Sequence, residues 1–338
     1  MFSNVNLSIY ELFCNGMLGL FFLFITCCVY VYLTSSRVPI VYVSDEERHF
    51  YDPRTKKRCL FPSINDQWSD ERDVHLSVII PAFNEEHRLP PMLDECLVML
   101  HNRLGLHFRY EVIVVSDGSN DHTVDISRIY AQKYGSRRFR IMELVANRGK
   151  GGAVRLGIQS ARGAVLLLAD ADGATRFEDL LILERHLKSL IGVDYRLHPD
   201  IVARKVAIVC GSRAHLEKRA KATRSYFRTL LMYGFHCMVW LFAVRGIRDT
   251  QCGFKLLTRA AARICFASLH VEGWAFDVEM LYIAQKLKIP VSEVAVNWTE
   301  IKGSKIIPVF SWIQMGKDVF MIWFKYRIGA WTLYGERD

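Results

Sequence analysis

Short apolar runs alternate with amphipathic segments from residue 76 onward, and this alternation limits the possible folds more than any other feature of the chain. The apolar runs are rich in Val, Ile and Leu and cover residues 76–80, 110–115, 139–145, 164–170 and 206–212. The amphipathic segments between them include residues 89–104, 123–134 and 151–161. Strands that alternate with helices predict an α/β fold with a largely parallel, doubly wound sheet.

Polar clusters follow four of the expected strands directly. They are residues 81–86 (PAFNEE), 116–121 (SDGSND), 147–152 (NRGKGG) and 170–173 (DADG). Each cluster by itself is common in turns, so none of them alone indicates a function. In open α/β sheets, however, ligands bind at the carboxyl ends of the strands. Because all four clusters take this position, we expect them to meet in one crevice.

Two acidic residues flank a single residue at the end of the fourth expected strand. Both carboxylates, of Asp170 and Asp172, can therefore reach one hard divalent ion. Magnesium and manganese prefer oxygen ligands and share their coordination shell with substrate phosphates. The pair favours a Mg²⁺ or Mn²⁺ site that serves a nucleotide diphosphate, and a solvated loop is the alternative.

The glycine-rich segment 147–152 is expected to open a helix. Free backbone N–H groups at a helix start attract anions, and Arg148 and Lys150 add positive charge. The segment lacks the spacing of a Walker A loop, and no GxGxxG follows the first expected strand. A phosphate-bearing substrate is therefore predicted, whereas a kinase, an ATPase or a dinucleotide-binding fold is not.

The charge and cysteine content narrow the partners further. The net charge of +9 comes from 44 Lys and Arg against 35 Asp and Glu, and it suits phosphate or acidic lipid. The basic residues are dispersed and form no recognition module, so we expect no nucleic-acid partner. Nine cysteines without a CxxC pair indicate reduced thiols and argue against structural zinc. Nothing in the pattern predicts an oligomeric state.

An uncharged stretch near the N-terminus predicts a membrane anchor. Residues 17–33 carry no charge, and with residues 12–16 they are long enough for a hydrocarbon core of about 30 Å. A cleaved signal peptide is the alternative, but the stretch lacks a basic start and an A-x-A site. Only Glu11 precedes it, whereas six basic residues follow at positions 37–58. The positive-inside rule then leaves the body in the cytosol, and the sequon at Asn297 stays unglycosylated.

These features divide the chain into four parts. We expect a lumenal tail and transmembrane anchor at residues 1–34, a linker at 35–74, a catalytic domain at 75–305 and an amphipathic interface segment at 306–338. The last part mixes tryptophan and phenylalanine with lysine and arginine, which is typical of headgroup depth, and a packed terminal helix is the alternative. Residues 226–244 are largely apolar and form either a second interface helix or a buried core helix.

Together these motifs resemble those of the family 2 glycosyltransferases, which have the nucleotide-sugar-binding GT-A fold. The matching segments are SVIIPAFNEE (77–86), VVSDGSNDHT (114–123) and LADADG (168–173). The resemblance implies a Rossmann-like mixed sheet flanked by helices and a D-x-D metal motif at Asp170 and Asp172. It also implies a nucleotide-sugar site formed by Pro81, Ala82, Phe83, Glu85, Asp117, Gly118, Arg148, Lys150 and Asp170. Many members carry two adjacent acids where this chain has Ser116-Asp117, so the contact to the uracil or ribose is expected to differ.

The second half resembles one branch of that family, the dolichyl-phosphate β-glucosyltransferases. The matching segments are residues 211–220 (GSRAHLEKRA), 224–236 (RSYFRTLLMYGFH), 248–259 (RDTQCGFKLLTR), 273–285 (GWAFDVEMLYIAQ) and 296–305 (VNWTEIKGSK). The resemblance implies transfer of glucose from UDP-glucose to dolichyl phosphate with inversion, for N-glycan precursor assembly at the endoplasmic reticulum membrane. Two alternatives stay open: a mannosyltransferase that uses GDP-mannose, and a membrane-tethered protein that binds nucleotide sugars without catalysis.

The proposed acceptor suggests roles for the remaining charged residues. A polyprenyl phosphate needs cations at the crevice, and the candidates are Arg213, Arg224, Arg228, Arg248 and Lys255. A phosphate monoester is largely ionised at neutral pH and needs little help from a general base. Catalysis is therefore assigned to Asp170, Asp172 and Asp277, and Asp277 is expected to orient the glucose or the metal shell.

Overall fold

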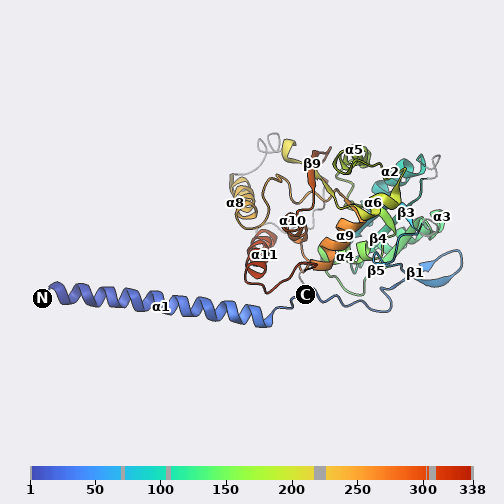
Figure 1. Cartoon of the computed structure of the whole chain (residues 1–338). Helices are drawn as coiled ribbons and strands as arrows, with labels where there is room; N and C mark the ends of the chain where they lie inside the picture. The colour runs from blue at the N-terminus through green and yellow to red at the C-terminus, as the bar shows by residue number, and fades with distance from the viewer. Residues whose placement is uncertain are drawn as a thin grey trace.

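The structure is a computed structural model that describes residues 2–69, 73–103, 108–216, 226–301, 303 and 310–335. Its first helix, α1 (Phe2–Thr34), projects away from the rest of the molecule (Figure 1). The part of α1 from Glu11 to Thr34 is long and apolar enough to cross a membrane, and none of it is buried against the protein. This agrees with the anchor expected from the sequence.

The body is built on a seven-stranded sheet with the order β5-β4-β3-β6-β8-β7-β9. The strands are β3 (Val74–Ala82), β4 (Tyr110–Ser116), β5 (Phe139–Glu143), β6 (Gly163–Leu168), β7 (Ile208–Ser212), β8 (Lys255–Thr258) and β9 (Val291–Ala295). Strand β8 pairs antiparallel with both of its neighbours, and the other pairings in this sheet are parallel. All five strands expected from the apolar runs are present. The sequence analysis missed β8 and β9, which are short and lack a long apolar run.

Helices cover both faces of the sheet. Neighbouring residues of one strand point to opposite faces, and the strands carry apolar side chains on both. Ile79 belongs to one buried cluster, whereas Val78 and Ile80 belong to the other. The first cluster is covered by α4 (Lys150–Gln159), α9 (Arg259–Ser268) and α10 (Phe276–Lys286). The second is covered by α2 (Leu89–His101), α3 (Thr123–Tyr134), α5 (Leu180–Ile191) and α6 (Pro199–Arg204). Burial on both faces explains why the strands are continuous apolar runs.

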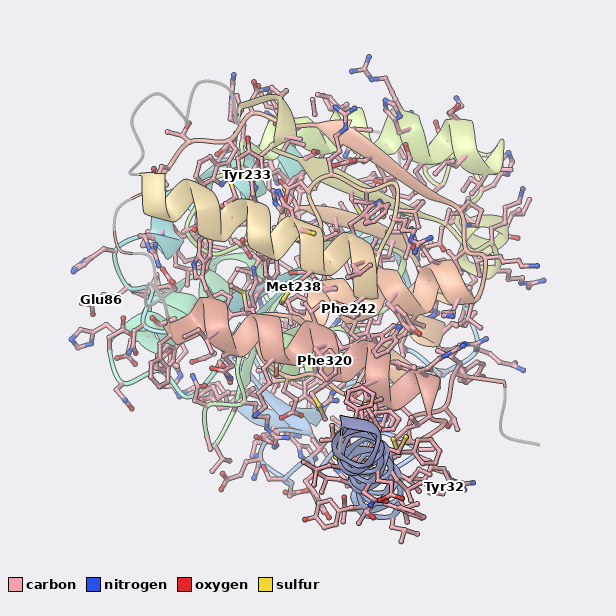
Figure 2. All side chains as sticks on the ribbon, turned by 90° about the vertical axis from the view of Figure 1, so that its left-hand side faces the viewer. Tyr32, Glu86, Tyr233, Met238, Phe242 and Phe320 are labelled. Carbon is pink, nitrogen blue, oxygen red and sulfur yellow. The ribbon has the colours of Figure 1, made fainter. Side chains whose placement is uncertain are left out.

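Two further helices, α8 (Tyr226–Phe242) and α11 (Phe310–Arg327), lie side by side on the face from which α1 projects (Figures 1 and 2). They pack closely, since a Cβ added to Gly316 would lie 2.8 Å from Met238 Cε. The ring of Phe242 contacts the ring of Phe320 with centroids 5.6 Å apart. Large apolar side chains remain exposed on both helices, including Trp240, Leu241, Phe310 and Ile313.

The stretch between α1 and the sheet, expected to be a linker, is packed against the body. It contains a hairpin of β1 (His49–Asp52) and β2 (Lys57–Leu60). Phe61 and Ile64, which follow the hairpin, are buried in the core formed with α4 and α9. At its start, the backbone oxygen of Arg37 accepts hydrogen bonds from the N–H and hydroxyl of Thr332, near the C-terminus.

Candidate active site

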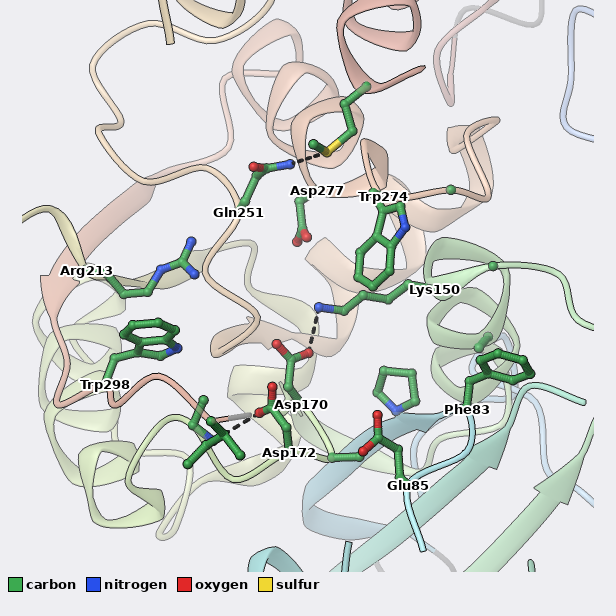
Figure 3. A pocket seen from close by; sticks show the side chains of 18 of the residues that line it. Phe83, Glu85, Lys150, Asp170, Asp172, Arg213, Gln251, Trp274, Asp277 and Trp298 are labelled. Carbon is green, nitrogen blue, oxygen red and sulfur yellow. Dashed lines mark hydrogen bonds and ion pairs between the residues drawn. The ribbon is translucent and has the colours of Figure 1, made fainter. Parts of the chain in front are cut away.

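A cavity of about 610 Å³ opens at the carboxyl ends of β3, β4 and β6. Residues from all four polar clusters line it, which confirms that the clusters meet in one crevice. A second wall comes from α8 and α11 and includes Phe235, His236, Trp312 and Met315. Figure 3 shows Lys150, Asp170, Asp172 and Asp277 pointing into the same space. The cavity therefore combines a charged floor with an apolar and aromatic wall.

The loop after β4 holds Asp117 in a fixed orientation. Its carboxylate Oδ1 accepts a hydrogen bond of 2.7 Å from the backbone N–H of Arg148, and its carbonyl accepts one of 3.0 Å from Asn147 Nδ2. Gly118 allows this contact, because its φ is +67° and an added Cβ would lie 2.8 Å from Asn147 N. Burial raises the pKa of Asp117 despite these hydrogen bonds. Asp117 lines the cavity, whereas Gly118 supports it from behind.

The end of β3 supplies another part of the floor. Pro81, Ala82, Phe83 and Glu85, which the resemblance assigns to the nucleotide sugar, all line the cavity. Glu85 pairs with Arg88, whose Nε donates a hydrogen bond of 2.6 Å to Oε2. The backbone N–H of Glu85 donates to Thr123 Oγ1 at 2.7 Å, which ties this loop to the start of α3.

Asp170 and Lys150 form an ion pair at the centre of the floor, with 2.6 Å between Oδ1 and Nζ. Burial alone would lower the pKa of Lys150, but the charges of Asp170 and Asp277 hold it above its usual value. The chain passes very close to Asp170 at Gly253, where an added Cβ would lie 2.1 Å from Oδ2. Only glycine fits at this position without displacing the carboxylate.

Asp172 lies beside this pair on the floor of the cavity (Figure 3). Its Oδ1 accepts a hydrogen bond of 3.0 Å from the N–H of Ala174. Burial and the charge of Asp170 raise the pKa of Asp172. The carboxylates of Asp170 and Asp172 together fit a divalent cation, which would relieve the repulsion between them. In the described part of the chain no group of three His, Cys, Asp or Glu side chains could hold a metal ion. Divalent cations of this kind commonly take further oxygen ligands from substrate phosphates and water.

Asp277 lines the cavity, and Lys255 lies behind it. Lys255 is fully buried, and its Nζ is 2.7 Å from Asp277 Oδ1. Burial alone would lower the pKa of Lys255, but Asp277 holds it above its usual value. Lys255 was expected to contact the acceptor phosphate. Because its ammonium faces Asp277 and not the cavity, its influence on any ligand passes through Asp277.

The other expected acceptor cations lie in different environments. Arg213 lines the cavity, forms a two-point ion pair with Asp249 and lies over the ring of Trp298 at 5.5 Å. Arg248 is exposed and does not line the cavity. Arg224 and the side chain of Arg228 lie outside the described residues. Arg213 is thus the one expected acceptor cation that the described part of the chain places at the cavity wall.

Arg148 departs most clearly from its expected place in the nucleotide-sugar site. Its guanidinium does not line the cavity, although its neighbours Asn147, Gly149 and Lys150 do. It pairs instead with Glu47, at 2.6 Å between Nη2 and Oε2. The loop contributes to the cavity through its backbone and Lys150, not through the arginine side chain.

Several lining residues were not identified as site residues from the sequence. The ring of Trp274 lies 5.8 Å from Lys150 Nζ, and Gln251 Nε2 is 3.1 Å from Met315 Sδ. His236 and Trp312 belong to α8 and α11. Trp274 and Gln251 were visible only as members of matching segments, and helical spacing gave no sign that His236 and Trp312 face a cavity.

Known proteins similar to this chain belong to the family 2 glycosyltransferases that the sequence motifs resemble. A model of the glycosyl transferase family 2 matches residues 77–193. A dolichyl-phosphate beta-glucosyltransferase of Drosophila melanogaster is 59% identical, over 85% of this chain and 85% of the relative. The Homo sapiens enzyme of that name is 54% identical, over 91% and 92%, and the Saccharomyces cerevisiae enzyme is 40% identical, over 80% and 80%.

Among solved structures, glucosyl-3-phosphoglycerate synthase from Mycobacterium tuberculosis, in complex with uridine diphosphate, has the same fold. The TM-score is 0.50 with 15% identity, over 76% of this chain and 80% of the other. At this identity the likeness shows the fold alone, and the fold is of the GT-A type expected from the sequence.

Proposed function

The chain belongs to the dolichyl-phosphate β-glucosyltransferases of glycosyltransferase family 2, and from this premise we propose that it transfers glucose from UDP-glucose to dolichyl phosphate. The reaction inverts the anomeric carbon and gives dolichyl β-D-glucosyl phosphate, a glucose donor for N-glycan precursor assembly. The observation that carries the proposal is the composition of the cavity. Its floor suits a nucleotide diphosphate, and its wall on α8 and α11 suits a lipid.

The donor occupies the floor. Pro81, Phe83 and Asp117 surround the nucleoside, and Lys150 faces the diphosphate. Asp170 and Asp172 would hold Mg²⁺ or Mn²⁺, which supplies positive charge against the phosphates of the departing nucleotide. The ion pair of Lys150 with Asp170 keeps the ammonium protonated and directed at the same place.

The acceptor approaches from the wall. Its phosphate is already anionic and requires a cation more than a base. Arg213 supplies that cation, and its pairing with Asp249 fixes the direction of the guanidinium. Asp277, fixed by Lys255, orients the glucose between donor and acceptor. Alignment and charge placement then provide most of the rate enhancement.

The protein is anchored in the endoplasmic reticulum membrane by a single span, with the body in the cytosol. The basic residues after α1 support this orientation. The exposed apolar side chains of α8 and α11 lie on the face from which α1 projects, so both helices can rest at the interface (Figure 2). Asn297 donates a side-chain hydrogen bond of 2.9 Å to Asp179, which is compatible with an unglycosylated sequon.

Product identification tests the proposal directly. The purified full-length protein is incubated with dolichyl phosphate, Mg²⁺ or Mn²⁺, and labelled UDP-glucose or GDP-mannose. We expect a glucosyl lipid with the β configuration from UDP-glucose and no lipid product from GDP-mannose. A mannosyl lipid would replace the proposal with the mannosyltransferase alternative. Binding of UDP-glucose without any lipid product would favour the non-catalytic alternative.

A further inference from the structure

The segment that joins the membrane anchor to the body contributes to the proposed donor site from outside the cavity. We call residues 36–48 the juxtamembrane strap. Its last turn places Glu47 against the loop 145–150, where the residue is 1% exposed. None of the strap residues lines the cavity. A buried carboxylate at such a position needs partners, and those of Glu47 lie in the strap itself and in the loop 145–150, which we call the donor loop.

Glu47 is held by three hydrogen-bond donors. Oε2 accepts from Arg148 Nη2 at 2.6 Å and from the backbone N–H of Ser44 at 2.9 Å. Oε1 accepts from the backbone N–H of Val145 at 3.2 Å. Burial alone would raise the pKa of Glu47, but these donors hold it below its usual value, so the carboxylate is ionised at neutral pH. Charge-assisted hydrogen bonds of this kind fix geometry well.

Arg148 transmits this constraint to the donor floor. Its guanidinium also donates to the carbonyl of Tyr42 in the strap. Its backbone N–H donates at 2.7 Å to Asp117 Oδ1, a carboxylate that lines the cavity. The side chain of one residue is therefore fixed by the strap, and its main chain orients a proposed nucleoside contact.

We infer that Glu47 is a positioning residue for the nucleotide-sugar donor, which it affects through Arg148 and the loop that orients Asp117. This inference rests on the proposed function, because it assigns Asp117 to the donor. The other end of the strap is also fixed, because the backbone oxygen of Arg37 accepts two hydrogen bonds from Thr332, which follows α11. The strap thus connects the anchor, the segment that follows α11 and the donor loop.

Kinetics of the full-length enzyme test the inference. Glu47→Gln keeps the shape and removes the charge, and we expect the KM for UDP-glucose to rise about five- to tenfold. The KM for dolichyl phosphate and kcat should stay within about twofold of wild type. Glu46→Gln is the matched control, because it removes the same charge from an exposed neighbour and should change nothing.

A double-variant comparison separates the two possible roles of Arg148. If Glu47 and Arg148 act as a pair, Glu47→Gln combined with Arg148→Gln should raise the KM for UDP-glucose no further than Arg148→Gln alone. Additive effects, with Arg148→Gln much the larger, would mean that Arg148 binds the diphosphate itself. Equal effects on both KM values, or no difference between Glu47→Gln and Glu46→Gln, would overturn the inference.

Calorimetric titration with UDP keeps this test separate from the proposed reaction. Weaker UDP binding by Glu47→Gln than by Glu46→Gln is expected whatever the acceptor is, and equal binding contradicts the role of the strap. Failure of the wild type to glucosylate dolichyl phosphate would instead contradict the proposed function. Should Glu47→Gln not fold, Glu47→Asp keeps the charge but shortens the reach, and an intermediate loss of UDP affinity is expected.

Discussion

The donor floor and the acceptor wall belong to one cavity but are stabilised in different ways. On the floor, Asp117 and Asp172 are oriented by backbone N–H groups of Arg148 and Ala174, in the loops that follow β5 and β6. On the wall and beneath it, Arg213 and Lys255 are oriented by carboxylates from other segments of the C-terminal half. The charge of Asp117 or Asp172 can therefore be removed without breaking an ion pair, unlike the charge of Asp170, which pairs with Lys150. A charge near the wall cannot, so function and stability are coupled there.

The largest effect is expected beneath the wall, at Lys255. Lys255→Met leaves Asp277 buried without its ion-pair partner, which should lower the free energy of unfolding by about 3–5 kcal/mol. Chemical unfolding in detergent measures this loss. Adding Asp277→Asn removes the uncompensated charge and should restore part of the stability. Lys286→Met, at an exposed lysine, is the control. Unfolding of Lys255→Met at the wild-type midpoint would show that the pair is not structural.

On the floor, Asp172→Asn should separate activity from stability. The amide oxygen can still accept the hydrogen bond from Ala174, but the charge opposite the proposed metal is gone. We expect kcat to fall by about 10²–10³-fold, which corresponds to about 2.7–4 kcal/mol, with no loss of thermal stability. Asp125→Asn, at an exposed position of α3, controls for a general charge effect. Retained activity would remove Asp172 from the metal site.

The same contrast explains which parts could be predicted from the sequence. The strands β3 to β7 and the polar clusters that follow four of them in the sequence are local patterns. A buried parallel strand is a continuous apolar run, and ligand-binding residues follow it directly. Residue order alone therefore predicted that the four clusters meet, whereas the assignment of Pro81, Phe83 and Asp117 to a nucleotide sugar came from the family resemblance. Asp170 and Asp172 needed no knowledge of distant partners.

Two residues that the sequence predicted to face the cavity, Lys255 and Arg148, instead contact carboxylates from distant segments of the chain. Lys255 begins β8, a strand of four residues that apolar periodicity did not reveal, and its partner lies in α10. Arg148 is turned out of the cavity by Glu47, from a stretch expected to be a linker. In both cases the residue type suggested a ligand for phosphate. A buried carboxylate elsewhere in the chain determined its actual contact.

At the outer edge of the wall, exposed aromatic residues should affect only the lipid substrate. Trp240 on α8 is 57% exposed, and Phe310 on α11 is 77% exposed. Changing Trp240 to serine removes apolar area that would enter the interface, and we expect the KM for dolichyl phosphate in vesicles to rise about five- to tenfold. The KM for UDP-glucose should not change. Leu197→Ser, 72% exposed in the turn between α5 and α6, is the control. A loss equal to that of the control would contradict an interfacial position for α8.

The smallest effect is a pH dependence that distinguishes the floor from the wall. The pKa of Asp172 is raised in the folded protein by burial and by Asp170, so ionised Asp172 lowers stability when no metal is bound. This cost is present at neutral pH and disappears as the pH falls through the raised pKa and below the value in the unfolded chain. Metal-free Asp172→Asn should thus melt slightly above wild type at neutral pH, and the gap should close on acidification. Mg²⁺ with UDP should reverse the order at neutral pH, because only the carboxylate gains from the cation. A gap that persists at acid pH would show that the stability change comes from packing and not from charge.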